Sequence, residues 1–318
     1  MVFREGSFKW KRYVALTVLT AVFIYFLFTG AISLFYAGAV IHPDSVTVSA
    51  IDKNLAYPYS SVSFKSRIDA ASKDSVTLHG WHFNAKKTDR AMIIVHGFGG
   101  NRFPFGAETL DLIDALVAID FNVLVFDLRN SGGSEAGVSA FGLHEKNDVL
   151  GAIDFMHEAG YERLALLGVS TGANTAAIAA AHTLTEDVGA IVLDSPITDM
   201  SEFILRLVRL ENPKLPEFPF NYEVPGMVGL YLNGDIRDAN LSKNLARYIP
   251  RPVLLIHGNN DEIVSMEDIN AAYEDYMSRA VGKISIWHVP GAGHAECFSY
   301  SKDEYLERVT AFLQRVFI

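Results

Sequence analysis

Cysteine is almost absent from this 318-residue chain, which contains a single one, Cys297. A lone cysteine excludes an intramolecular disulfide and a zinc site built from cysteine ligands. We expect Cys297 to be a free, buried thiol. Half of the residues are apolar, so one large domain or two small ones can bury a sizeable core. The sequence shows no internal repeat and no low-complexity segment.

Several common chemistries also lack their sequence signatures. Neither His144-Glu145 nor His157-Glu158 is followed by a second histidine at the spacing that binds zinc in metalloproteases. The chain has no Gly-x-x-x-x-Gly-Lys-Ser/Thr loop for phosphate, and the glycines within residues 97–100 lack the Gly-x-Gly-x-x-Gly spacing of a dinucleotide site. The net charge is −10 and no basic run follows the N-terminus, which argues against a nucleic-acid partner. We therefore expect neither a metal nor a cofactor.

Charge is missing altogether from residues 13–41. A bilayer core needs about 20 apolar residues, so this stretch is long enough to span one. Basic residues precede it and acidic residues follow it, so the positive-inside rule keeps residues 1–12 in the cytoplasm and places the rest of the chain outside. The flanking charges are Arg4, Glu5, Lys9, Lys11 and Arg12 before the stretch, and Asp44 and Asp52 after it. We predict a single-pass membrane anchor.

Two alternatives to the anchor remain open. Residues 37–39, Ala-Gly-Ala, resemble a signal-peptidase site, although the apolar region of a signal peptide runs for about 7–15 residues and this one is far longer. A buried core helix is the other alternative, although a helix of this length with no polar face is unusual in a soluble core.

The remainder of the chain alternates strand-like and helix-like patterns. Residues 42–59, with Pro43 and Pro58, are expected to form a linker and an entry segment. Residues 62–67 and 76–83 alternate apolar and polar side chains, which predicts an antiparallel pair of half-buried strands at a sheet edge. Six continuous apolar runs follow, as is typical of strands buried on both faces of a parallel sheet. These runs are residues 92–95, 123–126, 164–167, 191–193, 253–256 and 284–287. Helical patterns occupy residues 107–119, 145–159, 171–182, 266–279 and 303–316. This alternation predicts an α/β domain over residues 60–318, with a mostly parallel sheet flanked by helices.

One interval, residues 197–249, breaks the alternation with a long insertion. It contains a helix-like stretch at residues 203–210 and a cluster of four prolines, Pro213, Pro216, Pro219 and Pro225. Long insertions at the carboxyl edge of a parallel sheet usually cover the site there, so we interpret this one as a cap. A loosely packed surface excursion is the alternative. The apolar and aromatic side chains of the cap favour a substrate with an apolar part; they include Phe203, Leu207, Phe218, Phe220, Tyr222 and Tyr231.

The pattern Gly168-x-Ser170-x-Gly172 stands between a predicted strand and a predicted helix. A serine on so sharp a strand-to-helix turn is held clear of the backbone as a nucleophile. It then needs a histidine to take its proton and an acid to orient that histidine. Asp261 and His294 each follow a later predicted strand, in the order serine, acid, histidine that α/β-hydrolases use. We predict Ser170, Asp261 and His294 as a catalytic triad.

Rival residues exist for the acid and the base. Asp194 follows the strand at residues 191–193, and Glu262 adjoins Asp261. The histidines near other strand ends are His96, His257 and His288. For these three histidines we expect structural hydrogen bonding.

A serine nucleophile also needs backbone N–H donors that stabilise the negative charge developing on the carbonyl oxygen of the substrate. Thr171 follows the nucleophile at a helix start, and the loop His96-Gly97-Phe98-Gly99-Gly100 follows an earlier strand. We predict the N–H groups of Thr171 and Phe98 as the oxyanion hole, with Gly99 as the alternative to Phe98. A glycine-rich turn without this role is the other interpretation of the loop.

From about residue 62 to its end the chain resembles the α/β-hydrolase fold superfamily. The resemblance rests on the residues named above and on the segment 127–134, Asp-Leu-Arg-Asn-Ser-Gly-Gly-Ser, which is similar to the Asp-x-Arg-Gly-x-Gly-x-Ser loop of the peptidase-like and lipase-like branches. Asn130 and Ser131 depart from that pattern and resemble membrane-anchored bacterial hydrolases. The resemblance implies a serine hydrolase acting on an ester, thioester or amide, with esterase or lipase chemistry preferred. An aminopeptidase-like enzyme and a non-catalytic, membrane-tethered binding protein remain alternatives.

Overall fold

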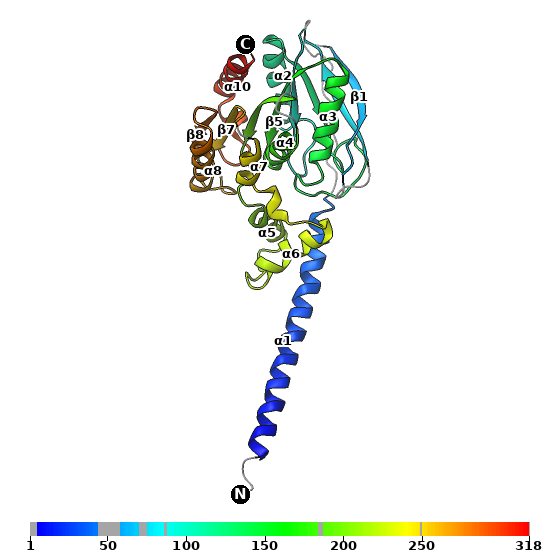
Figure 1. Ribbon diagram of the computed structural model, residues 1–318, viewed down its shortest axis with the longest axis vertical. Helices are drawn as coiled ribbons and strands as arrows, with labels where there is room; N and C mark the ends of the chain where they lie inside the picture. Colours follow the sequence, from blue (N-terminus) through cyan, green and yellow to red (C-terminus); the bar gives the residue numbers. More distant parts are fainter. Residues whose placement is uncertain are drawn as a thin grey trace.

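The computed structural model describes residues 5–43, 58–69, 75–85, 88–183, 187–248 and 250–317. Helix α1 (Glu5–Val40) projects as one rod from an α/β domain, with the N-terminus at its far end (Figure 1). The first four residues of the predicted cytoplasmic segment 1–12 lie outside the described chain. So do residues 44–57 of the predicted linker 42–59, and residue 249 at the end of the predicted cap.

The described strands form one sheet in the order β1-β2-β4-β3-β5-β6-β7-β8. Strands β1 and β2 pair antiparallel at one edge, β2 pairs antiparallel with β4, and β4 through β8 run parallel. The α/β class and the antiparallel edge pair are therefore confirmed. The bounds are β1 Tyr59–Lys65, β2 Thr77–Phe83, β3 Arg90–Val95, β4 Asn122–Phe126, β5 Arg163–Val169, β6 Val188–Asp194, β7 Val253–Gly258 and β8 Ile284–Val289.

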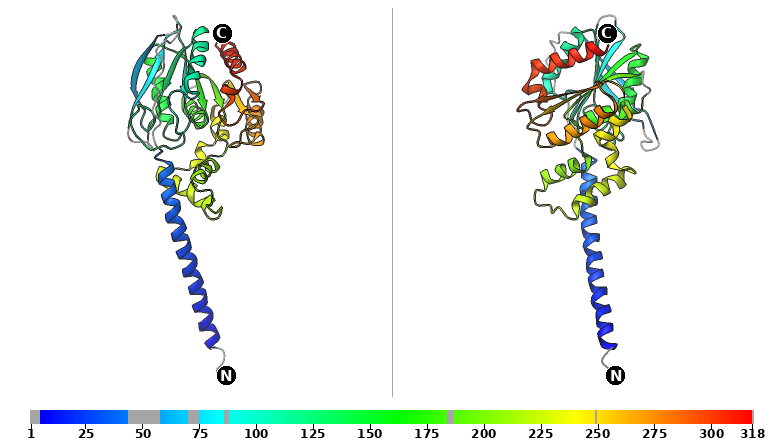
Figure 2. Two further views of the ribbon diagram at one scale, coloured as in Figure 1. Left: turned by 180° about the vertical axis from the view of Figure 1, so that it is seen from behind. Right: turned by 60° about the vertical axis from the view of Figure 1, so that its left-hand side comes forward.

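Helices cover both faces of the sheet (Figure 2). One core layer includes side chains of α3 (Lys146–Glu158), α4 (Thr171–Ala181), α7 (Leu241–Tyr248) and α8 (Met266–Arg279). The other includes side chains of α2 (Thr109–Ala118), α9 (Cys297–Tyr300) and α10 (Lys302–Val316), with a short 3₁₀ turn, η1 (Gly106–Glu108), before α2. Successive strand residues enter opposite layers, as Ile93 and Ile94 of β3 do. This two-sided burial explains why the central strands have continuous apolar sequences.

The insertion between β6 and β7 contains α5 (Met200–Glu211), α6 (Phe220–Leu232), the 3₁₀ turn η2 (Ile236–Ala239) and α7. Asn174 of α4 holds both ends of the excursion: its Nδ2 donates to Ile197 O and to Ala239 O, each at 2.8 Å. The chain between these two residues stands away from the sheet beside α1 (Figure 1). Helix α7 instead packs on α4 and α8, so it serves as the crossover helix that leads into β7.

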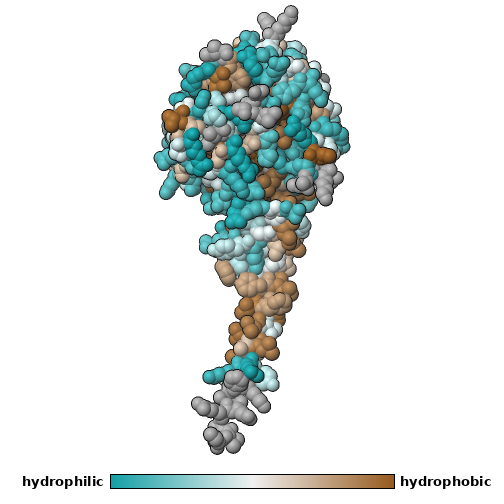
Figure 3. Space-filling model, in the orientation of Figure 1, coloured by the Kyte–Doolittle hydropathy of each residue, from teal (hydrophilic) through white to brown (hydrophobic). Residues whose placement is uncertain are grey.

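The exposed length of α1 is its main feature. Residues Trp10–Val40 form a helix that is long and apolar enough to cross a membrane, and only 11% of its most apolar stretch is buried. Apolar side chains cover much of the visible face of the projecting rod (Figure 3). The helix begins eight residues before the predicted anchor, at Glu5. Its exposure argues against the alternative of a buried core helix.

Candidate active site

Ser170 occupies the sharp turn between β5 and α4. Its φ of 55° and ψ of −127° are strained for a residue with a side chain, and its N–H donates to Asp194 O at 2.8 Å. The turn requires a glycine on either side of it. A Cβ on Gly168 would lie 2.4 Å from Gly172 O, and one on Gly172 would lie 2.3 Å from His96 O. Strand and helix therefore approach closely while the serine side chain projects outwards.

The structure brings the three predicted side chains into one hydrogen-bonded chain. Ser170 Oγ lies 2.8 Å from His294 Nε2, and His294 Nδ1 lies 2.8 Å from Asp261 Oδ2. The Asp261 carboxylate is fully buried, whereas the His294 side chain is 15% exposed. Because β5, β7 and β8 end at the same sheet edge, the loops after them place the residues together.

The surroundings of Asp261 favour its charged form. Burial opposes the charge, but the hydrogen bond with His294 and the N–H groups of Ile263 and Val264 outweigh it, so the pKa of Asp261 lies below its usual value. An ionised Asp261 accepts a hydrogen bond from the Nδ1–H of His294 and so keeps that proton on Nδ1. The Nε2 atom is then left with a lone pair for the Ser170 hydroxyl, which is the tautomer that a general base needs.

The rival acids occupy other positions. Asp194 Oδ1 accepts a hydrogen bond from the Ser195 hydroxyl at 3.0 Å, and burial raises the pKa of Asp194 to about 6. Glu262 is exposed. Of the acids weighed from the sequence, Asp261 is therefore the one that His294 Nδ1 contacts.

Two of the rival histidines are held in structural hydrogen bonds. Buried His96 has its Nδ1 2.8 Å from Gly97 O, and its Nε2 accepts the Leu128 N–H at 3.0 Å. His257 Nε2 lies 3.0 Å from Val264 O. Burial lowers the pKa of both imidazoles, which keeps them neutral. Burial also lowers the pKa of the third, His288.

The loop after β3 runs beside the nucleophile. A Cβ added to Gly97 would lie 3.6 Å from Ser170 Oγ. The N–H of Phe98 donates to Thr171 Oγ1 at 2.7 Å, while the N–H of Thr171 itself is in the first turn of α4, where backbone donors lack partners within the helix. The ring of Phe98 contacts that of Phe203 on α5, with centroids 6.4 Å apart. An aromatic part of the cap thus borders the loop that was predicted to bind the oxyanion.

Sequence reasoning named Asp194 only as a rival acid and missed Ser195; together the two residues contact Ser170, strand β7 and the loop of His294. Asp194 O accepts the Ser170 N–H, and the Ser195 N–H donates to Ile256 O of β7 at 2.9 Å. The Ser195 hydroxyl accepts the N–H of Ala295, the neighbour of His294, at 3.1 Å. Ser195 has a positive φ of 50° and is fully buried. A serine in this backbone conformation has no sequence signature that could have identified it.

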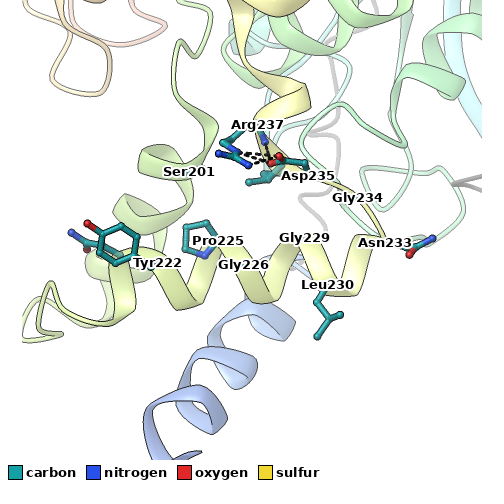
Figure 4. A pocket seen from close by; sticks show the side chains of 12 residues that line it. Ser201, Tyr222, Pro225, Gly226, Gly229, Leu230, Asn233, Gly234, Asp235 and Arg237 are labelled. Carbon is teal, nitrogen blue, oxygen red and sulfur yellow. Dashed lines mark hydrogen bonds and ion pairs between the residues drawn. The ribbon is translucent and has the colours of Figure 1, made fainter. Parts of the chain in front are cut away.

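A cavity of about 760 Å³ lies within the cap, and none of its lining residues belongs to the triad (Figure 4). Its walls include Tyr222, Gly226 and Leu230 of α6, together with Asp235 and Arg237 at η2. Within the described ranges, no group of three or more His, Cys, Asp or Glu side chains is arranged to hold a metal ion.

The chain belongs to the α/β-hydrolase fold family, whose sequence model matches residues 90–222. It is 31% identical over 249 residues to the uncharacterized protein YfhR of Salmonella typhi, with 73% of this chain and 75% of YfhR covered. It is 24% identical over 243 residues to the uncharacterized protein YqkD of Bacillus subtilis, with 75% and 76% covered. These matches confirm the family resemblance.

Solved structures agree on the fold. The Pyrococcus furiosus esterase PF2001 superposes with a TM-score of 0.70 at 23% identity, covering 88% of this chain and 99% of that one. Est1E from Butyrivibrio proteoclasticus superposes with a TM-score of 0.59 at 19% identity, covering 80% and 98%.

Proposed function

We propose that the protein is a serine hydrolase that cleaves a carboxylic ester, thioester or amide through an acyl-enzyme, with an ester of an apolar acyl group preferred. The observation that carries the proposal is the unbroken hydrogen-bonded chain from Ser170 Oγ through His294 to the buried Asp261 carboxylate. The esterase PF2001, which shares the fold, supports the ester preference. The contact between the rings of Phe203 in the cap and Phe98 in the loop 96–100 supports a preference for an apolar acyl group.

The geometry supports the following reaction. Ser170 Oγ attacks the carbonyl carbon while His294 Nε2 takes its proton, and the charge of Asp261 stabilises the resulting imidazolium. His294 then returns the proton to the leaving alcohol, thiol or amine, which leaves the acyl group on Ser170. Water, deprotonated by His294, attacks this acyl-enzyme; as the bond to Ser170 Oγ breaks, His294 returns the proton to Oγ and the acid is released.

The N–H groups of Thr171 and Phe98 stabilise the oxyanion in this scheme. The Phe98 N–H donates to Thr171 Oγ1 in the structure, so the substrate oxygen takes the place of that hydroxyl when it arrives. The exchange keeps the amide partnered before and after binding, which avoids the cost of a buried donor without an acceptor.

We propose further that α1 anchors the enzyme in a membrane by a single pass, with its N-terminus in the cytoplasm and the catalytic domain outside. The support is the apolar rod Trp10–Val40 and the basic residues before it.

A fluorophosphonate probe tests the nucleophile. Wild type and Ser278→Ala, which changes an exposed serine on α8, are expected to be labelled, and Ser170→Ala is not. Equal labelling of all three proteins, or of none, would contradict the proposal. Rates on p-nitrophenyl esters of increasing chain length, compared with aminoacyl nitroanilides, then separate an esterase from an aminopeptidase. A protein that binds ligands but turns over neither series would be the non-catalytic alternative.

A further inference from the structure

Helix α6 consists mainly of apolar residues. Its thirteen residues, Phe220–Leu232, include one charged side chain, Glu223. The two carboxylate oxygens of Glu223 accept hydrogen bonds from the hydroxyls of Thr29 and Ser33 on α1, both at 3.0 Å. The single charge of α6 is therefore turned towards α1. A short surface helix without a charged outer face is unusual for a helix that faces water.

The cap also gathers exposed apolar side chains. Outside α1, the structure describes nine large apolar side chains that are exposed, and five of them lie between residues 210 and 231. Four border or belong to α6, and we call them the α6 rim: Phe218, Tyr222, Leu230 and Tyr231, with 61%, 77%, 71% and 50% of their surface exposed. Exposed apolar patches of this kind mark surfaces that bind a protein, a ligand or a membrane.

The position of α6 along α1 indicates what the rim contacts. A bilayer core takes about 20 helical residues, so a span that starts at Tyr13 ends near Ile32. Helix α6 contacts α1 on both sides of that point. Phe218, two residues before α6, meets the ring of Phe26 edge-on with centroids 6.2 Å apart, and Tyr231 of α6 lies against Gly38. Helix α6 runs across α1, and Leu230 points to the side on which α1 descends (Figure 4).

We propose that α6 lies in the outer boundary of the bilayer as a second membrane contact, with the α6 rim among the headgroups and upper acyl chains of the lipid. The occupant of this surface is the lipid leaflet itself, because α6 packs against the part of α1 that lies where the hydrocarbon core ends. The α6 rim supplies the aromatic and aliphatic groups that interfacial helices bury about 5–10 Å deep. This inference rests on the proposed anchoring of α1.

A consequence for the substrate rests also on the proposed hydrolase activity. Phe203 on α5, in the same cap, touches the loop that would bind the oxyanion. A cap seated in the leaflet therefore brings lipid next to the catalytic edge of the sheet. The substrate class that this arrangement favours is an acyl ester dissolved in the membrane.

Site-directed fluorescence tests the contact directly. Cys297 is fully buried, so a cysteine introduced by Leu230→Cys is the accessible thiol of the full-length chain. Val281→Cys, at a side chain that is 81% exposed and belongs to the turn before β8, is the matched control. Each variant is labelled with an environment-sensitive fluorophore and placed in phosphatidylcholine–phosphatidylglycerol vesicles containing a spin-labelled lipid. We expect blue-shifted emission at position 230 and quenching several-fold stronger than at position 281.

Two results would overturn the proposal. One is emission at position 230 that matches water and is quenched no more than at position 281. The other is a blue shift that is not quenched by the spin-labelled lipid and grows with protein concentration, which would assign the surface to a second copy of the chain.

Activity provides an independent measurement. Leu230→Glu is expected to lower the hydrolysis of a long-chain ester in vesicles several-fold and to leave a short-chain, water-soluble ester unaffected, while Val281→Glu changes neither rate. Equal loss on both esters would contradict the membrane role. If wild type hydrolyses no ester at all, the hydrolase proposal fails, and the quenching result still decides whether α6 contacts lipid.

Discussion

Replacing Asp194 by asparagine is expected to stabilise the protein at neutral and alkaline pH. Burial raises the pKa of this carboxyl from 3.8 to about 6. Between these two values the folded state holds a proton that the unfolded state has released, so stability falls as the pH rises through this window. The cost at pH 8 is about 3 kcal/mol, because each pKa unit corresponds to about 1.4 kcal/mol. At pH 4.5 it is about 1 kcal/mol.

The asparagine fits the site. Its oxygen can accept the Ser195 hydroxyl as Asp194 Oδ1 does. Its amide replaces Oδ2, an atom that makes no hydrogen bond of good geometry among the described residues. The Tyr305 hydroxyl interacts with the Asp194 carboxyl, and by rotating it can accept from the amide. The gain from Asp194→Asn is therefore expected to be about 2 kcal/mol larger at pH 8 than at pH 4.5.

Urea unfolding of the full chain in detergent micelles at both pH values measures this difference. Asp120→Asn makes the same charge change at an exposed side chain and is expected to shift stability by less than about 0.5 kcal/mol. A gain from Asp194→Asn that is equal at the two pH values would refute the reasoning, as would a loss of stability at pH 8.

Three further predictions follow from the site and its supports. Asp261→Asn is expected to lower kcat for ester hydrolysis by about 10⁴-fold, because the amide favours the wrong tautomer of His294. The far-UV circular dichroism spectrum should stay unchanged, and a loss of kcat below tenfold would contradict the role of the acid. Gly172→Ala is expected to prevent correct folding, since the new Cβ would lie 2.3 Å from His96 O, and well-folded, active protein on gel filtration would disprove that conflict. Burial raises the pKa of the Cys297 thiol, so iodoacetamide is expected to modify it only after denaturation, as mass spectrometry would show.

The sheet was predictable because its physical cause is visible in the sequence. A strand buried on both faces, such as β5, needs apolar residues at consecutive positions, and the run at residues 164–167 has them. The loops after such strands share one sheet edge, so the order of Ser170, Asp261 and His294 along the chain was enough to bring them together in the prediction.

Helix α6 was not predicted, and its sequence explains why. Pro225, Gly226 and Gly229 lie inside it, and each disfavours a helix interior. The helix forms because it packs against α1 and α5, so tertiary contacts override the local preference. Ser195 was missed for a different reason: its role depends on a left-handed backbone and on contacts with loops that are distant in the sequence.

The residues that directly follow α1 are hydrogen-bonded to the catalytic domain. Ile41 O accepts the Ser139 N–H at 2.9 Å, and Pro43 O accepts a hydrogen bond from Asn130 Nδ2 at 3.2 Å. With α1 in a membrane, such a junction holds Ser170 at a fixed distance from the lipid surface. Ser170 then meets substrate by diffusion in the plane of the leaflet and not by diffusion through the bulk solution. Turnover would then depend on the mole fraction of substrate in the leaflet, and diluting that substrate with inert lipid would slow the enzyme even at constant bulk concentration.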